Sequence, residues 1–225
     1  MAMNDNSLLN KDYRPIPGWA LLLFLAALVA IFAVFAALAV VRGPLLAGQD
    51  LLAILAVFYG VGLCAVALGV APMGKAALPA LGGRPAGWRP IVFGVVGTIA
   101  LSMGVSQFGI EPKAMKEAID LAHKPGTLGV SLFVLAGMAP LVEELVFRGL
   151  LYGWIAGRWN TVAAWIMSSI VFAGAHYEPA HIVLVLPLGF LFGYLRRHTG
   201  SLLPSLCAHI VNNGFAVLAA AYLDM

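Results

Sequence analysis

Long apolar runs separated by short polar joints dominate the chain. Most of these runs approach or exceed the roughly 20 residues that a helix needs to cross the hydrocarbon core of a bilayer. The pattern therefore predicts an all-α fold, a polytopic transmembrane helical bundle of about seven helices. The predicted membrane segments cover residues 18–41, 51–71, 90–108, 127–156, 160–177, 180–195 and 201–223.

The composition of the 225 residues agrees with a membrane location, because 62% are hydrophobic and only 10% are charged. Soluble domains carry about a quarter charged residues. The formal net charge of +3 does not indicate a nucleic-acid partner, because the basic residues are scattered among the joints, as membrane topology requires. We expect a multi-pass protein of the cell membrane that has the lipid bilayer as its partner and binds no nucleic acid.

The basic residues of the joints predict how the chain is oriented. Cytoplasmic joints carry an excess of Lys and Arg, so the two sides of a seven-span bundle can be compared. The N-terminal side holds Lys11, Arg14, Lys75, Arg84, Arg89, Arg158, Arg196 and Arg197, and the other side holds Arg42, Lys113, Lys116 and Lys124. Eight against four predicts a cytoplasmic N-terminus.

The joint at residues 111–125 has a pattern of its own. Met115, Ala118, Ile119 and Ala122 recur at helical spacing between charged residues. Such spacing is typical of an amphipathic helix that lies at the membrane surface. We therefore predict a short surface helix in this joint.

Three charged residues interrupt the fourth apolar run. On insertion scales each charge at mid-helix costs about 2.5–3.5 kcal/mol, so their presence needs a reason. Glu144 and Arg148 are four residues apart and can form an ion pair on one helix face. Glu143 is rotated by about 100° from Glu144 and has no helical partner of opposite sign. We therefore expect a structural Glu144–Arg148 pair and a functional Glu143.

Further polar residues occur in the runs that follow. His176 lies four residues after Phe172, and His209 lies four residues before Asn213. Residues four apart share a helix face, so each pair can face the interior of the bundle from its own helix. Two histidines, a carboxylate and an amide can thus converge between helices.

The spacing of these residues predicts their depth. Glu143 and His176 are 33 residues apart and lie at equal depth if the chain turns halfway, near residues 159–160. His209 lies closer to the turn that precedes its own helix, which gives a depth mismatch of roughly 10 Å. A tilt of the helices or a break at Pro204 has to absorb this difference.

Together these residues form three motifs in order within three apolar runs. They are EExxxR at Glu143, Glu144 and Arg148, FxxxH at Phe172 and His176, and HxxxN at His209 and Asn213. The set resembles the motifs of the CPBP family, the CAAX protease and bacteriocin-processing (Abi) family of intramembrane proteases. The resemblance divides the chain into N-terminal membrane helices with an amphipathic joint, residues 1–126, and a CPBP-type protease core, residues 127–223.

The resemblance implies an intramembrane endopeptidase that acts on a peptide or membrane-protein substrate. In the family, the first glutamate of the EE pair and the histidine of FxxxH are thought to activate water, while the last histidine and asparagine hold the oxyanion. Carried over, Glu143 and His176 activate the water, and His209 and Asn213 stabilise the oxyanion. Glu144, Arg148 and Phe172 support the site.

The family is also commonly labelled metalloprotease, and these residues permit that interpretation. Glu143 or Glu144, together with His176 and His209, supplies three ligands and an open position for zinc. However, the sequence contains no HExxH, and a glutamate-activated water needs no metal. We expect no cofactor and keep zinc as the alternative.

Two other functions stay open at this point. In a proton-coupled transporter, Glu143, His176 and His209 would form a proton relay, although the sequence shows no inverted repeat of the kind that many transporters have. A non-catalytic binding or immunity member of the same fold would keep the motifs without cleaving anything. Only an assay separates that last possibility from an enzyme.

Overall fold

The computed structural model describes residues 15–42, 51–110, 112–113, 121 and 126–222. These residues are helical or irregular, and none of them forms a strand. The helices before the predicted core are α1 (Gly18–Arg42), α2 (Leu51–Val70), η2 (Ala71–Ala76), α3 (Ala77–Leu81) and α4 (Trp88–Ser106). Most of the predicted surface helix at 111–125 falls outside the described residues.

The C-terminal half contains one long helix followed by three separate ones. The long helix runs from Leu128 to Arg158 as the consecutive segments α6 (Leu128–Ser131), η3 (Leu132–Met138), α7 (Ala139–Glu143), η4 (Glu144–Leu151) and α8 (Tyr152–Arg158). The other three are α9 (Thr161–Gly174), α10 (Pro179–Thr199) and α11 (Leu203–Tyr222).

Six helices in the described part of the chain are long and apolar enough to cross a membrane. The seventh apolar helix, α9, has only 14 residues, which is about 21 Å of helix against a hydrocarbon core of about 30 Å. The predicted all-α membrane bundle is confirmed, but the segment predicted at 160–177 is a shorter helix that ends at Gly174. The cytoplasmic position of the N-terminus stays a prediction.

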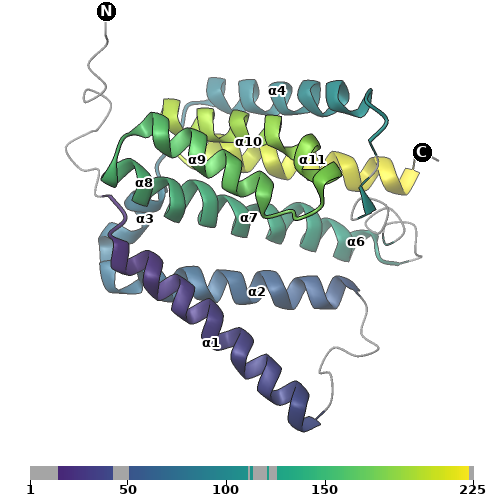
Figure 1. The fold of residues 1–225 in the computed structure, drawn as a ribbon. Coiled ribbons are helices and arrows are strands. Elements are labelled where there is room, and N and C mark those ends of the chain that lie inside the picture. The colour runs from purple at the N-terminus through teal and green to yellow at the C-terminus, as the bar shows by residue number, and fades with distance from the viewer. Residues whose placement is uncertain (1–14, 43–50, 111, 114–120, 122–125, 223–225) are drawn as a thin grey trace, which may run out of the picture.

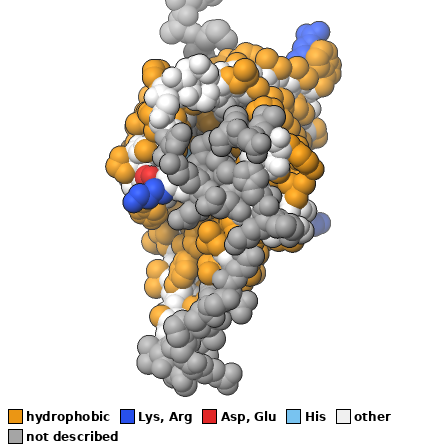
Figure 2. Space-filling model, turned by 90° about the vertical axis from the view of Figure 1, so that its right-hand side faces the viewer, with side chains coloured by type: hydrophobic (Ala, Val, Ile, Leu, Met, Phe, Trp, Pro, Cys, Tyr) orange, Lys and Arg blue, Asp and Glu red, His pale blue; other side chains and the backbone are white. Residues whose placement is uncertain are grey.

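The long helix lies between two groups of helices (Figure 1). On one side α2 packs against it, and α1 packs on α2 and diverges from the bundle towards its C-terminal end. On the other side lie α9, α10 and α11, with α4 packed on α10 and α11. The charged residues of the fourth run are therefore surrounded by helices. Figure 2 views one end of the bundle, where the visible described side chains are mostly hydrophobic and few are charged.

Small residues let these helices approach each other closely. A Cβ atom on Gly62 of α2 would lie only 2.7 Å from Cγ1 of Val142, the residue before Glu143. A Cβ atom on Gly94 of α4 would lie 2.8 Å from Cδ1 of Leu195 on α10. Close approach at small residues is the usual way that membrane helices pack. The Gly62 contact brings α2 against the part of the long helix that carries the glutamates.

A buried arginine joins the end of α10 to the long helix. Arg196 is only 2% exposed, and its Nε donates a hydrogen bond of 2.9 Å to the carbonyl of Arg148. Its Nη1 donates to the carbonyl of Gly200. Gly82 covers the guanidinium, since a Cβ atom there would lie 2.6 Å from Cζ of Arg196, and its φ of +90° suits glycine.

Replacing Arg196 with methionine should therefore destabilise the protein. The substitution keeps much of the buried volume but removes the donor from two carbonyls, and an unsatisfied buried polar group costs about 1–3 kcal/mol. Thermal unfolding in detergent measures the effect. Arg158→Met is the matched control, because Arg158 is exposed at the end of α8 and its loss should leave the midpoint unchanged. Equal midpoints for the two variants would contradict a structural role for Arg196.

Candidate active site

The two adjacent glutamates lie near the middle of the long helix. Glu143 is 15 residues from both Leu128 and Arg158, so it is placed deep in the bundle. The segments η3 and η4 on either side of it have π-helical hydrogen bonding. Pro140 lies between them and has no N–H to donate to the preceding turn. Short π-helical segments inside α-helices occur frequently at functional sites.

The predicted ion pair is present. Nη1 of Arg148 lies 3.2 Å from Oε1 of Glu144, and both side chains are fully buried. Arg148 also donates from Nη2 to the carbonyl of Gly189 on α10 at 3.0 Å. Its guanidinium lies 4.1 Å from the ring centroid of Phe172, a favourable cation–π distance. The buried positive charge is thus compensated by a carboxylate, a carbonyl and an aromatic face.

Phe172 contacts both motif histidines. Its ring is 2% exposed and makes edge-to-face contacts with the rings of His176 at 5.2 Å and His209 at 5.8 Å. Phe147 of the long helix contacts a further part of this ring at 5.4 Å. Phe172 therefore packs against both motif histidines and the long helix.

His209 contacts both glutamates. Its Nδ1 lies 3.2 Å from Oε1 of Glu144, and its Nε2 lies 3.7 Å from Oε2 of Glu143. The ring of Phe192 stacks on the imidazole at 4.8 Å. The helix that carries His209 runs unbroken from Leu203 to Tyr222, with Pro204 in its first turn. The sequence offered a helix break at Pro204 as one way to absorb the depth mismatch, and that alternative is wrong.

His176 lies at the other edge of Phe172. Its Nδ1 is 3.0 Å from the carbonyl oxygen of Phe172. Because a carbonyl only accepts hydrogen bonds, we assign the proton of a neutral ring to Nδ1, which leaves Nε2 as the acceptor. Within the described part of the chain, His176 has no hydrogen bond or ion pair with Glu143, so the two predicted water-activating residues share a site without direct contact.

Asn213 faces the long helix on its N-terminal side. Its Nδ2 donates a hydrogen bond of 3.0 Å to the carbonyl of Leu135 in η3. The neighbouring Asn212 accepts a hydrogen bond of 2.5 Å from Oγ of Ser102 on α4. One N–H of the Asn213 amide is used in this bond and the second remains as a donor, and the oxyanion role of Asn213 stays a prediction.

The predicted zinc ligands do not come together as a set. Among the residues that the structure describes, no three His, Cys, Asp or Glu side chains are close enough to hold a metal ion. His209 lies beside both glutamates, whereas His176 forms no metal-binding group with them among the described residues. This arrangement does not supply the three protein ligands of a catalytic zinc site. We therefore derive no step through a metal, and the expectation of no cofactor stays a prediction.

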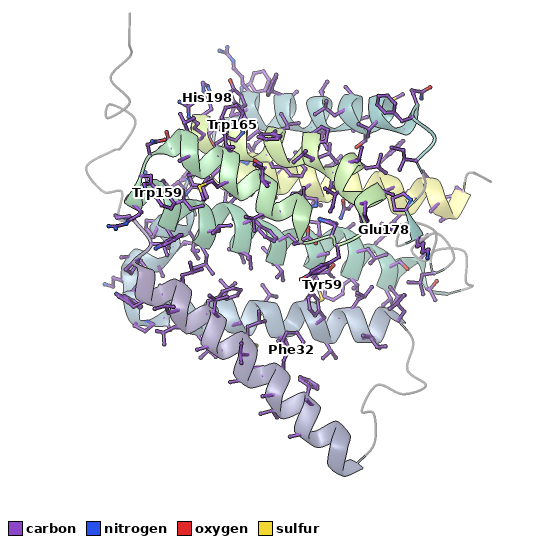
Figure 3. The ribbon with its side chains drawn as sticks, viewed as in Figure 1. Phe32, Tyr59, Trp159, Trp165, Glu178 and His198 are labelled. Carbon is purple, nitrogen blue, oxygen red and sulfur yellow. The ribbon has the colours of Figure 1, made fainter. Side chains whose placement is uncertain are left out.

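Two residues of the site were not predicted from the sequence. The ring of His181 on α10 lies 4.5 Å from that of His176, across the turn that follows α9. Tyr59 of α2 lies between that helix and the long helix (Figure 3) and within electrostatic range of Glu143. The separation of five residues between His176 and His181 was visible in the sequence. The position of Tyr59 near Glu143 depends on how α2 packs against the long helix, and no sequence motif indicates that packing.

Comparisons with known proteins agree with the motifs. Residues 125–215 match a family model described as Type II CAAX prenyl endopeptidase Rce1-like. YdiL of Bacillus subtilis, which is named as a membrane peptidase, is 30% identical over 81 residues, or 36% of this chain and 33% of that protein. The membrane-embedded CAAX protease MroQ of Staphylococcus aureus is 28% identical over 134 residues, or 57% of this chain and 53% of that protein.

The chain thus aligns with about a third of one curated relative and about half of the other. No solved structure matches. The division of the chain after residue 126 stays a prediction. The matched segment 125–215 contains all three motifs, and over this segment the resemblance to the CAAX protease family is confirmed.

Proposed function

We propose that this chain is an intramembrane endopeptidase that hydrolyses a peptide or membrane-protein substrate with a water molecule activated by Glu143. One observation carries the proposal: the two glutamates have different surroundings. The side chain of Glu144 is fully buried and paired with Arg148, whereas that of Glu143 is 20% exposed. Glu143 is therefore the carboxylate that water and a substrate can reach.

In the proposed reaction Glu143 accepts a proton from water as the water oxygen attacks the scissile carbonyl. The peptide nitrogen then takes a proton from the Glu143 carboxylic acid as the C–N bond breaks, so the protons balance. His176 has its Nε2 free as an acceptor and can help to orient the water. His209, fixed by Glu144 at Nδ1, has Nε2 on the side of Glu143 and can donate to the oxyanion when both ring nitrogens are protonated.

Accumulation of uncleaved precursors tests the proposal even though the substrate is unidentified. Membranes from cells that express the wild type or Glu143→Gln are compared by mass spectrometry of protein N-termini. We expect new N-termini with the wild type and intact precursors with the variant. Glu178→Gln is the control, because it makes the same chemical change in a glutamate outside the motifs. Identical N-termini in all three samples would contradict the proposal and favour a binding protein or a transporter.

Activity in the absence of zinc is a second expected result. If Glu143 activates the water, purified protein should hydrolyse its substrate without stoichiometric metal. Elemental analysis of active protein measures the metal content, and chelation followed by added zinc measures dependence on it. If the zinc content follows activity and added zinc restores a chelated sample, the metal-free mechanism is wrong, although the endopeptidase assignment still holds.

A further inference from the structure

A hollow of about 550 Å³ lies between the beginning of α4 and the end of α10, outside the three motifs. Arg89 and His198 form its polar side, while Phe93 and Tyr194 contribute aromatic rings. Tyr194 stacks on His198, with ring centroids 5.6 Å apart and ring planes within 12°. The lining therefore combines a guanidinium and an imidazole with aromatic rings.

The hollow lies at the ends of two helices that are long and apolar enough to cross a membrane. Arg89 is the second residue of α4, and His198 is the last but one of α10. Both helices are candidate membrane spans. Trp88, at the start of α4, is 69% exposed, and exposed tryptophans are typical of the membrane–water interface. Phe93 is one turn further along α4 and is 56% exposed.

The polar groups of the hollow have few partners in the protein. Arg89 lies 5.7 Å from the ring of Trp88 but forms no hydrogen bond or ion pair with any described residue. His198 has only its ring contact with Tyr194 among those residues. By contrast, the nearby Arg196 is buried and donates to carbonyl groups. The guanidinium of Arg89 is thus available to a ligand.

No carboxylate in the described part of the chain lies near the hollow to neutralise this charge. Glu143 and Glu144 are in the middle of the bundle. Glu178, at the start of α10, lies far along that helix from His198 (Figure 3) and accepts a hydrogen bond from the backbone N–H of Lys113. A ligand with a negative charge and an apolar part would complement both the basic and the aromatic side chains of the hollow.

We propose that the hollow binds an anionic phospholipid, with its phosphate at Arg89 and His198 and an acyl chain along Phe93 and Tyr194. Basic pockets between transmembrane helices are known to bind lipid headgroups, and a guanidinium is well suited to phosphate because it can donate two parallel hydrogen bonds. A zwitterionic lipid would add a second positive charge beside Arg89, which disfavours it. The proposal does not depend on the peptidase activity.

Lipid binding to the purified full chain tests the proposal. The protein in detergent is titrated with phosphatidylglycerol or phosphatidylcholine of identical acyl chains, and the bound lipid is counted by native mass spectrometry. We expect tighter binding of phosphatidylglycerol. Arg89→Gln should weaken that binding about fivefold, the effect of one basic residue near an anionic lipid surface. His198→Gln should also weaken the binding of phosphatidylglycerol.

Arg158→Gln is the matched control, since it removes one exposed arginine outside the hollow and should leave the affinity unchanged. Equal binding of the two lipids, or equal losses in Arg89→Gln and Arg158→Gln, would overturn the proposal. Glycerol phosphate serves as a soluble competitor in the same titration. If it displaces the lipid at concentrations similar to those of the lipid itself, the ligand is a free phosphate compound and the lipid assignment is wrong.

Discussion

Replacing Glu143 with glutamine should abolish peptide hydrolysis and leave the fold intact. An amide cannot accept the proton of the attacking water, and general-base catalysis contributes roughly 10²–10⁴ in rate. The side chain is partly exposed and lies 3.7 Å from Nε2 of His209, so the isosteric amide should fit without strain. The measurements are the initial rate with a substrate identified from the membrane comparison, and the unfolding midpoint of the same preparation.

The adjacent glutamate gives this experiment its sharpest control. Glu144→Gln makes the same chemical change one residue away, at a side chain with no exposed surface. It should lower stability, whereas Glu143→Gln should lower only activity. If Glu143→Gln keeps its activity while Glu144→Gln is fully folded but inactive, the roles of the two glutamates are reversed.

Features that depend on a single helix were predictable from the sequence. Long apolar runs predict helices, because a bilayer leaves no water to satisfy an unpaired backbone. The Glu144–Arg148 pair follows from a separation of four residues, and the structure has it at 3.2 Å. The Phe172–His176 contact is also present, but the expectation that one helix carries both residues was wrong, because α9 ends at Gly174 and His176 lies in the turn that follows.

Features that depend on two helices were less predictable. The motifs placed His209 near the glutamates, but they did not show that its two nitrogens face Glu144 and Glu143 separately. That arrangement depends on the rotation and offset of α11 against the long helix. The same limit explains Asn213, whose amide donates to the carbonyl of Leu135. A main-chain partner 78 residues away leaves no signal in a side-chain pattern.

The end of α9 shows a different limit. The apolar run continues past Gly174, so hydropathy predicted a segment up to residue 177. The helix stops earlier because the chain turns there, with Tyr177 at a φ of +58° and Pro179 starting the next helix. Non-glycine residues with positive φ are uncommon. The resulting turn brings His181 against His176, a contact that a longer straight helix would have prevented.

Neutralising Glu144 should cause a large loss of stability. Its carboxylate lies 3.2 Å from both Arg148 and His209, and the Arg148 side chain is fully buried. Glu144→Gln removes the negative charge beside the guanidinium, whose other contacts are the neutral Gly189 carbonyl and the rings of Phe172 and Phe192. Removing one partner of a buried ion pair costs about 3–5 kcal/mol. Chemical or thermal unfolding in detergent should show this loss of stability when Glu144→Gln, with Glu143 unchanged, is compared with the wild type.

A double substitution separates loss of the pair from general disruption of the core. If the cost of Glu144→Gln arises from the uncompensated charge on Arg148, then adding Arg148→Met should recover part of the lost stability, because replacing a whole buried ion pair is often close to neutral. The two changes would then be strongly non-additive, as expected for residues in direct contact. If the double variant loses as much stability as the two single variants added together, Glu144 and Arg148 do not stabilise each other.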